Sequence, residues 1–176
     1  MILRKRGDER GQGLVELSLI IPITLLLVAG VIEIGLVAND SLTLGYGSRE
    51  GARAGSALAQ GGAADCGGGS DPGGVDQTVV AAVQRIIQSG GSNVRLSDIS
   101  AIRIFRATAS GAKVSGFVNT WAYTGPSSGP DIDPGPGVSR LAFTPQSTQW
   151  PACSRVNDGN RDILGVEVIY DRQLIT

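Results

Sequence analysis

The chain has 176 residues, enough for one ordinary domain with an added segment but too few for two domains with separate cores. A formal net charge of -1 leaves no general basic surface, which argues against nucleic acid as a partner. Histidine is absent, which removes the commonest general base and metal ligand. We therefore expect no catalytic residues, no metal site, no cofactor and no small-molecule substrate.

The N-terminal region combines a basic leader with a long apolar run. Four basic residues stand in the first ten positions, and the next basic residue is Arg49. From Leu14 to Ala38 the chain is mostly apolar, and as a helix at ~1.5 Å per residue this run exceeds the ~30 Å core of a bilayer. A buried globular helix rarely stays apolar on every face for this length. We assign residues 12–38 as a transmembrane helix with a cytoplasmic N-terminus, because basic residues precede it and none follows closely.

An ordinary secretory signal peptide is a competing interpretation of the same region. Its apolar part usually spans ~7–15 residues and ends at a small-residue cleavage site. The run here is longer, and its end offers no convincing site of that kind. The remainder of the chain is therefore expected outside the cytoplasm, still attached to its anchor.

Residues 39–60 are expected to extend the anchor as a helix. Gly47, Gly51 and Gly55 recur every four positions and would form a flat stripe that another helix could approach closely. The alternative is a break near Gly45, because each glycine costs about 1 kcal/mol relative to alanine within a helix.

Residues 61–176 are expected to form an exported domain. A Gly-rich loop over 61–74 precedes an amphipathic helix from Val75 to Ile87. Alternating, β-branched segments predict a hairpin over 99–106 and 114–121 and a strand over 164–170. Residues 124–137 hold so many Pro and Gly that we expect no regular element there. The predicted fold class is α+β: a long N-terminal helix, a second helix and a small antiparallel sheet.

The two cysteines, Cys66 and Cys153, lack the spacing of a zinc ribbon or a redox pair. In an exported domain they would lie in an oxidising compartment, where two thiols of one domain commonly pair. We expect a Cys66–Cys153 disulfide, and the alternative is two buried free thiols.

The junction between leader and apolar run carries the most informative motif, Arg10-Gly11-Gln12-Gly13-Leu14-Val15-Glu16. Cleavage after Gly11 would give Gln12 a free α-amino group one helical turn from Glu16. A carboxylate in the bilayer centre costs about 2.5–3.5 kcal/mol on insertion scales, less near the edge, and an ammonium partner would offset that cost.

This arrangement resembles the class III signal of type IV pilins, in which cleavage follows glycine and the fifth mature residue is glutamate. The N-terminal third is also similar to the TadE-like family of minor pilins from tight-adherence pili. The matching segments are Gly11 to Glu16, Pro22, Ile32 to Gly35, and Ser48 to Arg53. Leu17 replaces an aromatic common in major pilins, which favours the minor-pilin branch, and the chain ends soon after its last strand, where longer relatives have another.

The resemblance implies a non-enzymatic, pilin-like protein with a leader over residues 1–11. A prepilin peptidase would remove the leader at Gly11 and Gln12, and the product would act in pilus assembly, adhesion or secretion. It would be a single-pass protein of the bacterial inner membrane, with the pilus or cell surface as a further location. Its partners would be the membrane, the peptidase, other pilin subunits and the pilus assembly machinery. Glu16, Pro22 and Glu33 are the residues assigned to assembly.

Several simpler interpretations remain for these residues. Glu16 and Glu33 could snorkel to opposite membrane faces, and Pro22 could only kink the helix. The charged trio at 49, 50 and 53 is either a solvated face or an intersubunit contact. A rival function is an uncleaved, membrane-tethered protein whose exported domain binds a ligand. An exported enzyme would have to use Asp131 and Asp133, which their Pro and Gly neighbours favour as turn residues.

Overall fold

The computed structural model describes residues 9–58, 74–89, 93–129, 131–135, 138–156 and 161–172, without the side chains of 9, 10 and 131–139. The chain divides into two compact units, Met1–Ala38 and Asn39–Thr176. We describe each unit by itself.

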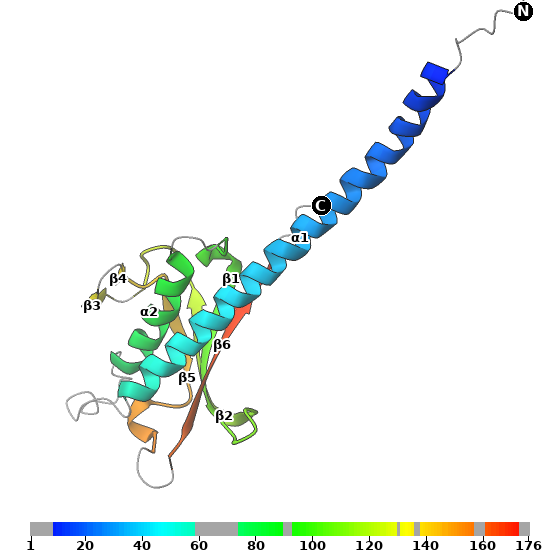
Figure 1. The fold of residues 1–176 in the computed structure, drawn as a ribbon. Coiled ribbons are helices and arrows are strands. Elements are labelled where there is room, and N and C mark those ends of the chain that lie inside the picture. Colours follow the sequence, from blue (N-terminus) through cyan, green and yellow to red (C-terminus); the bar gives the residue numbers. More distant parts are fainter. Residues whose placement is uncertain are drawn as a thin grey trace, which may run out of the picture. The chain divides into compact units, whose positions relative to one another are not determined.

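Helix α1 (Glu9–Leu58) supplies the described part of the first unit and continues into the second (Figure 1). Pro22 lies inside the helix and removes one backbone N–H. Nearby hydroxyls turn back onto the backbone: Ser18 donates to the carbonyl of Val15 at 2.8 Å, and Thr24 donates to that of Ile20 at 3.0 Å. Such bonds satisfy polar side chains locally, as an apolar surrounding requires.

The second unit also contains the α-helix α2 (Gly74–Gln88). Asp76 stands in its first turn and Arg85 in its last, so both charges complement the helix dipole. One face of α2 is apolar and buried, with Val79, Val80 and Val83 fully inaccessible to solvent. This face is the helical half of the hydrophobic core.

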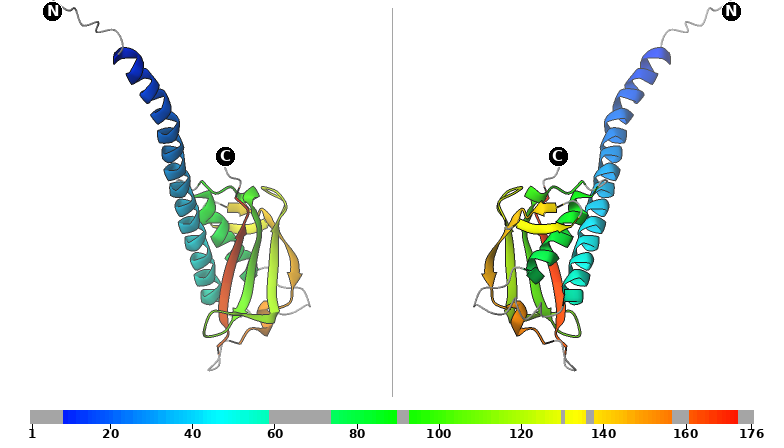
Figure 2. Two further views of the ribbon diagram at one scale, coloured as in Figure 1. Left: turned by 90° about the vertical axis from the view of Figure 1, so that its right-hand side faces the viewer. Right: turned by 90° about the vertical axis from the view of Figure 1, so that its left-hand side faces the viewer.

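A four-stranded antiparallel sheet forms the other half of the core. It consists of β1 (Ile99–Ala107), β2 (Lys113–Tyr123), β5 (Phe143–Thr148) and β6 (Ile163–Tyr170), in the order β5-β2-β1-β6 (Figure 2). A tight turn joins β1 to β2, and Gly111 there has a φ of 83°, a conformation that side chains disfavour. Short 3-10 helices, η2 (Leu96–Asp98) and η3 (Ala152–Ser154), precede β1 and β6.

Alternating residues of the strands meet α2. Ile102 and Ile104 of β1 are fully buried, together with Trp121 of β2 and Phe143 of β5. Each such side chain contributes about 1.5–3 kcal/mol when it leaves water. These elements confirm the predicted α+β fold class, with a second helix and a small antiparallel sheet.

The expectation that residues 124–137 hold no regular element is wrong. Strand β3 (Asp131–Gly135) pairs antiparallel with β4 (Val138–Arg140) in a separate two-stranded sheet. Such a ladder leaves one edge of each strand unpaired, so a proline at that edge breaks no bond between strands. The predicted strands also do not include β5, which contains Pro145. It lies at the edge of the main sheet, where proline is tolerated.

Candidate functional site

The N-terminal motif lies on an exposed part of α1. Gly11, Gln12 and Glu16 are all exposed, and the Gln12 amide Nε2 donates to Glu16 Oε1 at 3.2 Å. The two side chains are four positions apart and so occupy the same helix face, about 6 Å apart along the axis. If cleavage made residue 12 the N-terminus, its α-amino group would start one helical turn from the Glu16 carboxylate.

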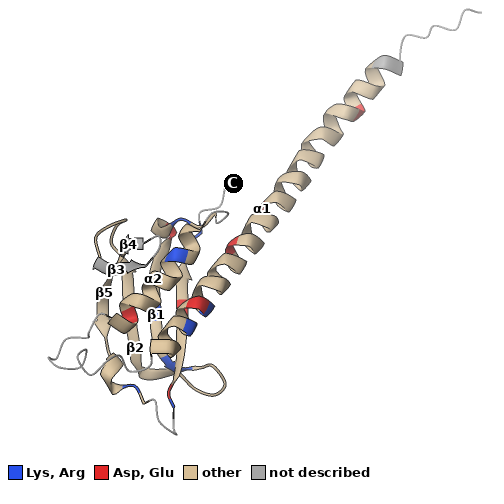
Figure 3. Ribbon diagram, turned by 60° about the vertical axis from the view of Figure 1, so that its left-hand side comes forward, with Lys and Arg blue, Asp and Glu red and all other residues tan. Residues whose placement is uncertain are grey.

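The helix around this motif is apolar on all sides. From Leu14 to Val37 its large hydrophobic side chains are exposed, apart from the partly exposed Leu36, and α1 contains one stretch long and apolar enough to cross a membrane, by length and composition. No residue of that stretch is buried by the rest of the described chain. Figure 3 shows that charged residues are rare along this part of α1 and gather in its last turns. A soluble protein rarely leaves so large an apolar surface uncovered.

Pro22 and Glu33, the other residues assigned to assembly, lie within this apolar part of α1. Pro22 is exposed and Glu33 is partly exposed. Among the described residues, no hydrogen-bond donor reaches Glu33 Oε1. The structure does not bring Glu16, Pro22 and Glu33 together into one site, because they are spread over several turns of one helix.

The glycine stripe faces inward, within the second unit. A Cβ added to Gly51 would lie 2.7 Å from a methyl group of Val83, and one added to Gly55 would lie 2.8 Å from a methyl group of Val79. Gly47 is the least tight, at 3.6 Å from Val83. The three glycines therefore let α1 approach α2 more closely than any larger residue would.

A buried carboxylate, Asp40, links α1 to the end of β6. The Tyr170 hydroxyl donates to Asp40 Oδ2 at 3.2 Å, and Arg172 Nη1 lies 3.1 Å from the same oxygen. Burial and the adjacent Asp40 carboxylate raise the pKa of Tyr170 above its ordinary value, because both disfavour the phenolate. These contacts hold the start of the second unit's helix against its last strand.

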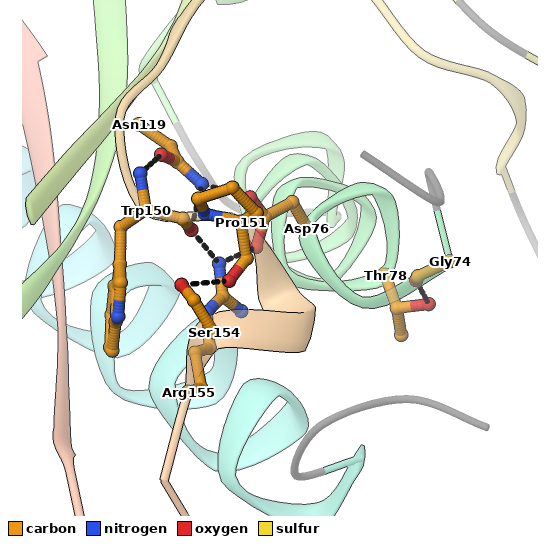
Figure 4. Close-up of polar contacts among 8 residues, drawn as sticks. All are labelled: Gly74, Asp76, Thr78, Asn119, Trp150, Pro151, Ser154 and Arg155. Atoms are coloured by element: carbon orange, nitrogen blue, oxygen red, sulfur yellow. Dashed lines mark hydrogen bonds and ion pairs between the residues drawn. The ribbon is translucent and has the colours of Figure 1, made fainter. Parts of the chain in front are cut away.

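A second buried network surrounds Asp76 at the N-terminus of α2 (Figure 4). Arg155 Nη2 lies 2.5 Å from Asp76 Oδ1, and Asn119 Nδ2 donates to Asp76 Oδ2 at 2.6 Å. Asn119 also exchanges two hydrogen bonds with the backbone of Trp150, at 2.7 and 2.8 Å. The Arg155 guanidinium stacks 4.6 Å above the Trp150 ring. The network fixes the segment around η3 against α2 and β2.

The sequence offered no signal for either network. Asp40 and Arg172 are 132 positions apart, and Asp76 and Arg155 are 79 positions apart. No local pattern marks such pairs, although a lone carboxylate directly after an apolar run, as at Asp40, could have drawn attention to the first.

The structure describes one of the two cysteines of the predicted disulfide. Cys153, within η3, is disulfide-bonded, whereas Cys66 lies outside the described residues. The Cys66–Cys153 pairing therefore stays a prediction.

We expect the unfolded, unreduced protein to show no reactive thiol and the reduced protein to show two. In the chain-entropy model, closing the loop between positions 66 and 153 stabilises the folded state by about 4–5 kcal/mol. Two reactive thiols before reduction would exclude the bridge, and a disulfide-linked dimer on a non-reducing gel would show that it joins two chains.

The fold and the helix together define a class of protein: a small α+β unit on a single N-terminal helix that is suited to anchoring it in a membrane. A comparison with family models is consistent with this class, because residues 11–53 match the TadE-like protein family. The match confirms the resemblance and covers α1 up to Arg53, but not α2 or the sheet. Searches of curated proteins and of solved structures found no match. In the part of the chain that the structure describes, no cluster of His, Cys, Asp or Glu could hold a metal ion.

Proposed function

We propose that this chain is a minor pilin of a tight-adherence pilus. It is made with a leader over residues 1–11, inserted into the inner membrane with its N-terminus in the cytoplasm, and cleaved after Gly11 by a prepilin peptidase. The exported unit then takes part in pilus assembly, and thereby in adhesion or secretion. The chain is the peptidase's substrate and catalyses no reaction itself.

One observation carries this proposal: the family match and the exposed apolar surface fall on the same helix. The TadE-like match begins at residue 11, the proposed cleavage site, and runs through the whole apolar stretch. In a pilin, one such helix has two successive roles. It first anchors the chain in the membrane and then packs against other subunits.

Glu16 has a specific role in this proposal. After cleavage, the Glu16 carboxylate can attract an α-amino group in surroundings where both charges are poorly solvated. Its own chain offers such a group one turn away at residue 12, and an adjacent subunit would offer another. An ammonium partner lowers the cost of keeping the carboxylate in an apolar assembly.

The rival function, a tethered ligand-binding protein, receives little support from the exported unit. A cavity of about 180 Å³ lies between α1, the segment after η3 and β6. Cavities that hold drug-sized ligands usually measure about 300–1,000 Å³. Two of its lining charges are already engaged, Arg155 by Asp76 and Asp162 by Arg106 at 2.8 Å.

We test the function by replacing Glu16 with alanine in a host that assembles tight-adherence pili. The variant should insert into the membrane normally, because removing a carboxylate makes the apolar helix more apolar. Pilus assembly should fall sharply, since the α-amino group loses its partner. Pilus counts, together with immunoblots of membrane and sheared-pilus fractions, give the measurement.

Asp171→Asn is the matched control, because Asp171 is an exposed carboxylate that lies outside α1. It should leave piliation unchanged. Normal piliation in both variants would contradict the role of Glu16 and favour the interpretation in which this carboxylate only snorkels.

A further inference from the structure

The second half of α1 has one face committed to its own unit. Gly47, Gly51 and Gly55 are covered by α2, and Leu44 packs against the hydrophobic core. The contacts of Asp40 with Tyr170 and Arg172 hold the same face at its N-terminal end. This face is therefore unavailable to another subunit, because it packs against α2 and β6.

The opposite face of this segment exposes a line of larger side chains. Leu42, Tyr46, Arg49 and Arg53 follow one another at intervals of four, three and four, which places them on one helix face. We call this line the outward ridge. Leu42 is 61% exposed, Tyr46 is 60% exposed, and the Arg53 side chain is 81% exposed. The ridge thus presents an apolar half followed by a cationic half.

Among the residues that the structure describes, little neutralises the cationic half. Glu50 lies 3.8 Å from Arg53, but both side chains are well exposed, and such pairs contribute little in water. The ridge also lies inside the part of α1 that matches the TadE-like family, which ends at Arg53. The family likeness therefore includes this exposed face, although it stops before α2 and the sheet.

The charges decide between two kinds of helical partner. If the ridges of two parallel copies, anchored in the same membrane, met symmetrically, Arg49 and Arg53 would face their own counterparts, and like charges in contact are destabilising. A helix with carboxylates opposite the two arginines and apolar side chains opposite Leu42 and Tyr46 would complement both halves. Such a helix would run parallel to α1 if it is anchored in the same membrane.

We propose that the outward ridge binds the corresponding helix of a different pilin-like subunit, whose carboxylates pair with Arg49 and Arg53. This inference rests on the proposed function, because it takes the partner to be another component of the same pilus. Arginine suits the role, since its planar guanidinium can bind a carboxylate through two parallel hydrogen bonds.

The test uses the full-length chain in a pilus-assembling host, with a photo-crosslinking amino acid in place of Tyr46. Irradiation should join the chain to a different pilin-like subunit, identified by mass spectrometry of the crosslinked peptide. The double variant Arg49→Glu with Arg53→Glu should lower the yield by about tenfold or more, because attraction becomes repulsion. The Arg49→Lys and Arg53→Lys pair should keep most of the yield, since it retains the charges.

Arg85→Glu is the matched control, because Arg85 is an exposed arginine of α2 outside the ridge. It should not change the crosslink. A crosslink to lipid alone, to a second copy of this chain, or to no other molecule would overturn the proposal, as would a yield unaffected by the charge reversal. The intact mass of the chain in the same samples distinguishes failure of this inference from failure of the proposed function. A chain that is cleaved after Gly11 but gives no crosslink refutes only the proposed ridge contact. An uncleaved chain refutes the proposed function.

Discussion

Replacing Asp76 with alanine should cost about 3–5 kcal/mol of folding stability, because it leaves a buried guanidinium without its carboxylate. Asp76 is completely buried, and Arg155 is only 4% exposed. The substitution also removes the acceptor for Asn119 Nδ2 and a negative charge near the N-terminus of α2. The loss therefore falls on α2, β2 and the segment around η3 together.

Unfolding of the full chain in detergent, followed by tryptophan fluorescence, can measure this loss. Both tryptophans, Trp121 and Trp150, are buried in the second unit, so their emission reports on its unfolding. Glu50→Gln should change the free energy of unfolding by less than about 0.5 kcal/mol, because its ion pair is exposed. A comparably small loss for Asp76→Ala would show that the buried network is not a main source of stability.

Alanine substitutions at Gly51 and Gly45 should have opposite effects on stability. A Cβ at Gly51 would lie 2.7 Å from Val83 and 3.3 Å from the carbonyl oxygen of Val79, so α1 or α2 must shift. Such overpacking typically costs about 1–3 kcal/mol. At Gly45 nothing lies within 4 Å of the added Cβ, and the change should stabilise the helix by about 0.5–1 kcal/mol.

The difference between these two variants isolates the contact between helices, because both gain the same helix propensity. It can be measured by the same unfolding experiment. Equal stabilisation by both substitutions would mean that α1 and α2 do not pack closely at Gly51.

The elements that could be predicted from sequence are those set by local patterns. The apolar run predicts the first part of α1, and the helix continues unbroken through Gly47 to Leu58. The alternation of β-branched residues predicts β1, β2 and β6. In each case the signal lies within the segment itself, so no knowledge of its neighbours is needed.

Features that depend on distant residues could not be predicted in this way. Pro145 excludes a central strand, but only the sheet order shows that β5 occupies an edge. The glycine stripe predicts a close helix contact without saying whether the partner is α2 or another subunit. The structure assigns that face to α2, and this is why the assembly surface has to be sought on the outward ridge.

The intact mass of the chain purified from membranes tests the central claim most directly. In a host with an active prepilin peptidase, the mass should correspond to a chain that begins at Gln12. In the same host without the peptidase, or with a Gly11→Val variant that blocks cleavage, it should correspond to the full chain from Met1. The account would be contradicted if the chain kept Met1 in cells whose peptidase processes a known prepilin. The protein would then be an uncleaved, membrane-tethered protein.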